Sequence, residues 1–118
     1  MAEKPECLAK GDELMEATLE KIRSLEQICI EGYEDSFLDN ALQKIISHQL
    51  ARDQADLQVL QQDLAELERQ YGISSEEFYT RFQAGQMSDE ADFMEWNALC
   101  KMATRLRNRL GILQGQEV

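Results

Sequence analysis

The chain has 118 residues and a formal net charge of −11, from 23 acidic and 12 basic residues. That length fits one domain, or one helical hairpin with a small lobe. Because phosphate repels an acidic surface, the charge argues against a protein that binds nucleic acid or anionic membranes. Apolar residues make up 43% and charged residues 30%, which is typical of a folded helical protein rather than a disordered one.

The first predicted helix spans residues 12–31. Its apolar side chains recur every three or four residues and mark one face, which consists of Met15, Leu19, Ile22, Leu25 and Cys29. Gly32 follows the last of them and is the expected stop. Residues 1–11 contain Pro5 and Gly11 and show little pattern, so we expect them to be frayed.

The second predicted helix spans residues 36–71, with Ser36 as a possible N-cap. At about 1.5 Å per residue it is a rod of roughly 50 Å, longer than a domain of this size is wide. Such a rod either bridges two lobes or pairs with another chain. Its second half carries apolar residues at heptad spacing, and we predict oligomerisation through Leu57, Leu60, Leu64 and Leu67. The polar residues 51–56 separate this stripe from an earlier one, formed by Leu38, Leu42, Ile45 and Ile46.

The third predicted helix, residues 75–84, has the clearest local signal in the chain. Ser74 at the N-cap and Glu77 three residues later form a capping box, and Ile73 and Phe78 form a hydrophobic staple. Gly72 is the expected end of the preceding helix, in a left-handed conformation.

The fourth predicted helix begins after Ser88 or Asp89 and runs to Leu113. Its apolar face is again heptad-spaced and consists of Trp96, Leu99, Ala103, Leu106, Leu110 and Leu113. Lys101, Arg105 and Arg109 form a basic stripe on one side of this helix, and we expect it to pair with the acidic first helix or with a partner. An anion site on this stripe is the alternative.

No segment alternates apolar and polar residues as a strand would. We therefore predict an all-α fold, a long helical hairpin or coiled coil with a small C-terminal helical lobe. Residues 1–40 hold 11 acidic and 4 basic residues. We divide the chain into an acidic N-terminal helical arm, residues 1–37, and residues 38–118, which hold the long helix, the short capped helix and the C-terminal helix.

No catalytic, cofactor or metal site is expected, and we predict that the chain is not an enzyme. The one histidine, His48, has no Glu-x-x-His partner and no nucleophile elbow beside it. The acidic residues Asp89, Asp92 and Glu95 lack the loop pattern of a calcium site, and helix capping explains them. Cys7, Cys29 and Cys100 show no C-x-x-C spacing, so zinc-ribbon and thioredoxin-type sites are excluded.

Free cysteines favour a reducing compartment. The first residues lack the apolar segment of a signal peptide, and no apolar run approaches the length of a membrane span. We therefore expect a cytoplasmic protein that is not associated with a membrane.

Six of the eight aromatic residues fall between Tyr71 and Trp96. One interpretation is that they form the core of the small lobe. They cannot all face inward, since Tyr79 is out of phase with its neighbours Phe78 and Phe82 on the short helix. Exposed aromatics ringed by acids are typical of protein interfaces. We therefore predict a partner-binding surface made of Phe78, Tyr79, Phe82, Phe93 and Trp96.

The segment from Leu67 to Gly85, LERQYGISSEEFYTRFQAG, continues at residues 89–96 as DEADFMEW. It resembles small prokaryotic helical proteins of the E-x-x-Y-G-[MI]-S-S-E-E-F-Y-x-x-F-x-A-G … D-x-x-D-F-x-E-W type. These proteins are uncharacterised or antitoxin-like, and their genes lie beside genes for putative toxins. The resemblance covers residues 45–112 and leaves out residues 1–37. It brings no catalytic residue, and it implies an acidic helical surface that covers a basic toxin.

Two functions follow as hypotheses. The first is a non-catalytic protein-binding module, an antitoxin-like inhibitor that masks a small basic partner protein, with the charge of −11 as support. The second is a self-associating coiled-coil structural or adaptor protein. We expect a homodimer in either case, with no nucleic acid as partner, although the basic stripe keeps nucleic-acid binding open.

Overall fold

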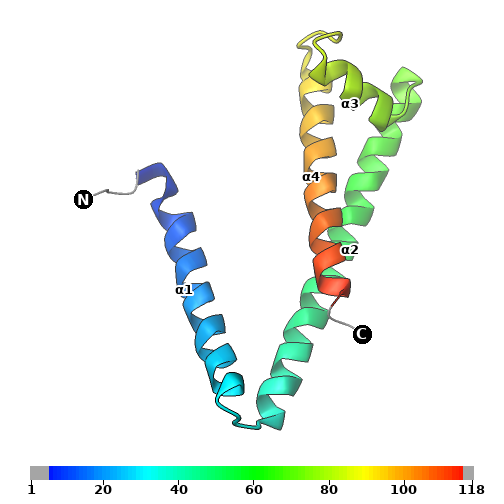
Figure 1. Ribbon diagram of the computed structural model, residues 1–118. Helices are drawn as coiled ribbons and strands as arrows, with labels where there is room; N and C mark the ends of the chain where they lie inside the picture. Colours follow the sequence, from blue (N-terminus) through cyan, green and yellow to red (C-terminus); the bar gives the residue numbers. More distant parts are fainter. Residues whose placement is uncertain (1–5, 116–118) are drawn as a thin grey trace. The chain divides into compact units, whose positions relative to one another are not determined.

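The computed structural model describes the backbone of residues 6–115 and the side chains of residues 13–115. The described residues form four helices and no strand: α1 (Glu6–Ile30), α2 (Ser36–Tyr71), α3 (Ser75–Gln83) and α4 (Ala91–Gln114) (Figure 1). The all-α prediction is confirmed. The chain divides after Asp39 into two units, which are described separately below.

The first unit consists of α1, a turn and the first residues of α2. The α1 helix begins at Glu6, so the prediction that it starts near residue 12 is wrong. Residues 6–11 hold one breaker, Gly11, which a helix tolerates at a cost of about 1 kcal/mol. The predicted fraying of residues 1–5 and the side chain of Cys7 lie outside the described residues.

A glycine ends α1 as predicted. Gly32 has a φ of +91°. The amide of Gly32 donates to the carbonyl of Cys29, and the amide of Tyr33 donates to that of Ile28, at 3.1 and 3.2 Å. This pair of bonds is a Schellman motif. The N-cap of α2 is Asp35 rather than the predicted Ser36, because the Asp35 Oδ1 accepts a hydrogen bond from the amide of Leu38 at 3.1 Å.

The second unit, Asn40–Val118, is a helical hairpin. The helices α2 and α4 run side by side in opposite directions, and α3 crosses between them at the end where α2 finishes and α4 begins (Figure 1). This is the predicted long hairpin with a small helical lobe. Its core combines residues of all three helices: Leu60, Leu64, Leu67, Phe78, Phe93, Trp96 and Ala103.

The four leucines predicted to mediate oligomerisation lie within this hairpin. Leu60, Leu64 and Leu67 are buried in the core, and Leu57 is partly buried against it. Their heptad spacing is therefore used to pair α2 with α4 of the same chain. A second chain could reach them only by opening the hairpin, so we do not place a dimer interface on this face.

The ends of α3 follow the predicted capping chemistry in part. The Ser74 hydroxyl accepts a hydrogen bond from the amide of Glu77 at 3.1 Å, as an N-cap does. The Glu77 carboxylate bonds Arg81 at 3.0 Å. The carboxylate of Glu68, on α2, accepts from the amide of Ser75 at 2.8 Å. A side chain from another helix thus satisfies one of the free amides at the start of α3.

The α4 helix begins at Ala91, after Glu90 at the N-cap, and Glu90 makes no side-chain capping bond. The prediction that Ser88 or Asp89 caps it is wrong. Ser88 lies two residues before this N-cap, and its hydroxyl donates a hydrogen bond of 2.8 Å to the Glu90 carboxylate. No helix of the described residues has the length and apolarity to cross a membrane.

Candidate functional site

An aromatic cluster fills the closed end of the hairpin. The rings of Phe78 and Trp96 stack with centroids 4.1 Å apart and planes 2° from parallel, and neither side chain is exposed. The Trp96 Nε1 donates a hydrogen bond to the Ser75 hydroxyl at 3.0 Å, so the one polar atom of the indole has a partner. Phe93 packs against Phe78, with centroids 5.7 Å apart. The cluster fixes α3 against α4.

Tyr71 closes this cluster from the end of α2. Its ring lies 5.0 Å from that of Phe93 and 5.7 Å from that of Trp96. Its hydroxyl donates a hydrogen bond of 2.5 Å to the carboxylate of Asp92 on α4. This bond, followed by desolvation and the negative charge of Asp92, raises the pKa of the Tyr71 phenol to about 12. The bond joins the two long helices at their closed end.

The five aromatics predicted to bind a partner therefore do not share one exposed surface. Phe78, Phe93 and Trp96 are buried, and Phe82 is partly buried against the core. Only Tyr79, which is out of phase with Phe78 and Phe82, lines an open groove. The alternative interpretation, in which the aromatics form the core of the lobe, describes their positions better. A two-helix hairpin has little interior, so large rings are needed to build a core at all.

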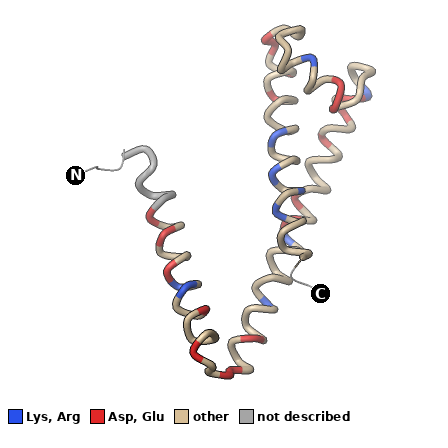
Figure 2. Tube along the Cα trace, viewed as in Figure 1, with Lys and Arg blue, Asp and Glu red and all other residues tan. Residues whose placement is uncertain are grey.

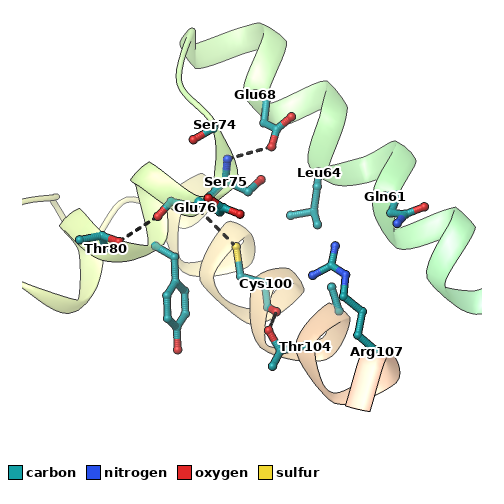
Figure 3. Close-up of a pocket in the computed structure, with 12 residues that line it drawn as sticks. Gln61, Leu64, Glu68, Ser74, Ser75, Glu76, Thr80, Cys100, Thr104 and Arg107 are labelled. Carbon is teal, nitrogen blue, oxygen red and sulfur yellow. Dashed lines mark hydrogen bonds between the residues drawn. The ribbon is translucent and has the colours of Figure 1, made fainter. Parts of the chain in front are cut away.

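That groove, of about 960 Å³, lies where α2, α3 and α4 meet, and we call it the Cys100 groove (Figure 3). It is mixed in polarity. Its walls are formed by Gln61, Leu64, Glu68, Ser74, Ser75, Glu76, Tyr79, Thr80, Cys100, Ala103, Thr104 and Arg107.

The Cys100 thiol is not activated as a nucleophile. Burial, and secondly the charge of Glu68, raise the pKa of the Cys100 thiol, while Arg107 lowers it by less. A thiol with a raised pKa holds little of the reactive thiolate at neutral pH. The Sγ lies 4.0 Å from the carbonyl of Ser75 and donates to it. The described residues hold no group of three or more His, Cys, Asp or Glu placed to bind a metal.

Towards the C-terminal end of α4, an ion pair with a buried carboxylate joins this helix to α2. Asp53 is 3% exposed, and its Oδ2 accepts a hydrogen bond from the Nε of Arg109 at 2.8 Å. By sequence pattern, Asp53 falls in a polar stretch between two apolar stripes. Its position shows the missed signal, because the spacing Leu50, Asp53, Leu57, Leu60 continues the heptad pattern. An acid at a core position opposite a basic helix predicts such a pair.

The basic stripe of α4 is thus only partly used within the hairpin. Arg109 holds Asp53, whereas Arg105 and Lys101 form no ion pair among the described residues. All three are exposed on α4, together with Arg107. Figure 2 shows these basic positions on successive turns of the helix. The stripe therefore retains positive charge that no acid of the described hairpin neutralises.

In the first unit no described side chain is buried. The predicted apolar face of α1 is present, and Met15, Leu19 and Ile22 are 62, 40 and 53% exposed. Residues 13–39 carry eight acidic and two basic side chains, and acidic positions recur along α1 in Figure 2. We call the stripe Met15, Leu19 and Ile22, with Glu26 one turn beyond it, the arm surface. It is an amphipathic helix with no core of its own.

The chain matches no protein-family model, no curated protein and no solved structure.

Proposed function

We propose that this chain is a non-catalytic protein-binding module, an antitoxin-like inhibitor that binds a basic partner protein through the arm surface of α1. One observation carries the proposal: the apolar stripe of a 25-residue helix has nothing in its own unit to cover it. A helix in a protein gains most of its stability by packing its apolar face against another element. A helix of this kind is the usual ligand of an apolar groove on a partner.

The charge of the arm surface defines the partner. Glu26 lies on the face of the apolar stripe, one turn past Ile22, and residues 13–39 carry eight acidic side chains against two basic ones, Lys21 and Arg23. Complementarity then requires a groove with an apolar floor and Lys or Arg on its rims. A small basic toxin is a partner of this type, and the sequence resemblance points in the same direction. We place the interaction in the cytoplasm.

Two side chains of the hairpin favour a non-catalytic role. The Cys100 thiol has a raised pKa, and the sole histidine, His48, lies exposed on α2. We propose that the hairpin is a rigid head and that α1 supplies the binding energy. This departs from the first expectation, in which the aromatic lobe bound the partner, because most of those rings are buried.

The proposal is tested by affinity capture from native lysate with three isotope-labelled baits. These are the wild type, the double variant Leu19→Gln/Ile22→Gln, and the control Ile28→Gln. Around the axis of the same helix, Ile28 lies at least a third of a turn away from both Leu19 and Ile22. Gln removes the apolar group while keeping helix propensity. We expect a basic protein to be retained by wild type and control and reduced at least about tenfold with the double variant, which corresponds to 1.4 kcal/mol.

Raising the salt concentration should weaken the same capture, since exposed opposite charges are screened. The proposal is wrong if the double variant retains every captured protein as well as the wild type does. It is also wrong if the captured proteins that depend on Leu19 and Ile22, apart from copies of this chain, are acidic rather than basic.

Self-association is the second candidate. It is favoured by exposed apolar side chains on the hairpin, Val59 on α2 and Met102 on α4, which line the same groove.

A further inference from the structure

The outer side of the hairpin carries a second groove, which we call the Met102 groove. It has a volume of about 440 Å³ and lies between α2 and α4. Its lining consists of Asp56, Val59, Leu60, Met102, Arg105, Leu106 and Arg109. Val59 and Met102 are 57 and 49% exposed, although each faces a groove with an apolar floor. Exposed apolar side chains gathered in one groove are typical of an interaction site.

The rim of the Met102 groove is predominantly basic on the α4 side. Arg105 and Arg109 line it directly. Lys101 lies one helical turn from Arg105, and residues 96–115 contain no acid. On the α2 side the groove has one acid, Asp56, and the nearby Asp53 neutralises Arg109. Among the described residues, Arg105 and Lys101 therefore supply the unpaired positive charge on this side, and the groove suits an amphipathic helix with an apolar stripe and a net negative charge.

We propose that the Met102 groove binds the α1 helix of a second copy of this chain. The arm surface has the required features, because Leu19 and Ile22 supply an apolar stripe and Glu26, one turn past Ile22, adds a negative charge within an acidic unit. Direct pairing of two α1 helices would instead bring like charges together. The inference rests on the proposed function in that it takes α1 as the binding element, and it names a specific partner for it.

Reciprocal binding gives a closed dimer. Each copy has one α1 helix and one Met102 groove, so two copies related by a two-fold axis satisfy both surfaces twice. The arrangement joins two contacts in one assembly, and the second forms at a high effective concentration. A basic partner protein would then compete with the Met102 groove for the same arm surface.

The test is complementation between two variants of the full chain, with the mass in solution measured by light scattering and sedimentation. The arm variant is Leu19→Gln/Ile22→Gln, and the groove variant is Val59→Gln/Met102→Gln. The controls are Ile28→Gln for the arm and Met94→Gln for the groove, since Met94 is an exposed methionine outside the Met102 groove on α4. All four variants change exposed side chains, and circular dichroism checks that they remain helical.

We expect the wild type and both controls to be dimers and each double variant to be a monomer at the same concentration. An equimolar mixture of the two double variants should form a heterodimer, because one chain keeps an intact arm and the other keeps an intact groove. With one contact instead of two, this heterodimer should have a higher dissociation constant than the wild-type dimer. We expect it to be detected as the total protein concentration is raised to about 1 mM.

Three results would overturn the inference. A monomeric wild type would place α1 elsewhere, on its own chain or on another protein. A dimeric groove variant would show that the copies associate without the Met102 groove. A mixture that stays monomeric would show that arm and groove do not recognise each other. None of these results affects the capture of a basic protein that depends on Leu19 and Ile22, so the proposed function is tested independently.

Discussion

Trp96, Phe78 and Tyr71 hold the closed end of the hairpin through contacts that sequence patterns do not reveal. The Trp96 indole stacks on Phe78 and bonds Ser75, and the Tyr71 hydroxyl bonds Asp92 on the opposite helix. Each contact joins residues 18 or more positions apart in the chain. Periodicity places these residues on helix faces, but only the fold pairs them with one another.

The Tyr71–Asp92 bond should make stability depend on pH in the alkaline range. The fold raises the pKa of the Tyr71 phenol from 10 to about 12, so it favours the protonated form. The bond therefore contributes its full stability below pH 10 and loses it as pH rises towards 12. We expect Tyr71→Phe to unfold more easily than wild type at pH 8, and the difference to shrink between pH 10 and 12.

Urea unfolding of both proteins across this range measures the difference. Tyr33→Phe is the control, because Tyr33 is exposed and its side chain is not bonded in the structure. A difference between wild type and Tyr71→Phe that stays constant from pH 8 to 12 would contradict the assignment. An absorbance titration should also lose its highest-pH tyrosine transition in Tyr71→Phe alone.

The ends of the helices were predicted best where a glycine stops a helix. Gly32, Gly72 and Gly85 all have positive φ and follow α1, α2 and α3. The predicted span of α2, residues 36–71, matches the structure. The capping residues of α2 and α4 were predicted less well, because a cap needs one particular hydrogen bond. Several neighbouring acids and serines can compete to make it.

Gly72 and Gly111 allow a matched test of helix ending. Gly72 has a φ of +73°, a conformation that a side chain makes unfavourable. Gly111 lies within α4, where a new Cβ would meet no atom within 4 Å. We expect Gly72→Ala to lower the free energy of unfolding by about 1–2 kcal/mol. Gly111→Ala should raise it by about 0.5–1 kcal/mol. Chemical denaturation measures both, and an equal effect of the two substitutions would refute this account.

The two units of the chain differ in how much they bury. The hairpin encloses a shared core of leucines and aromatics, whereas no described side chain of the first unit is buried. Local opening costs least where few apolar contacts must break. The chain thus combines a unit with a core and a unit without one among the described residues.

Hydrogen exchange should follow this division. We expect the slowest amides in the hairpin around Leu64, Phe78 and Trp96, and the fastest exchange in α1 at low protein concentration. Dimer formation should slow exchange in α1 as the concentration rises, by mass action. The variant Leu19→Gln/Ile22→Gln should show fast exchange in α1 at every concentration. Slow exchange in α1 of the most dilute wild type would contradict two expectations: that α1 exchanges fastest in the free chain, and that dimer formation is what slows it.

Local rules were enough to predict the all-α class, the glycines that end helices and the Ser74 cap of α3. These features depend on residues within one or two turns of each other, such as Ser74 with Glu77, and Gly72 with the end of α2. Heptad spacing also identified the faces of α2 and α4 that meet in the hairpin. Capping and helix-ending interactions form between residues that are close in the sequence, so the sequence alone was sufficient to predict them.

The use of each face depended on the tertiary structure. Leu60, Leu64 and Leu67 have the pattern of a dimer interface, yet they pack inside one hairpin. The aromatic residues have the composition of a binding surface, yet most fill the small core. An apolar stripe shows that a helix must be covered, but not by what. The answer depends on which other stripe the fold brings opposite to it. For α1, no described side chain of its own unit is buried against such a stripe.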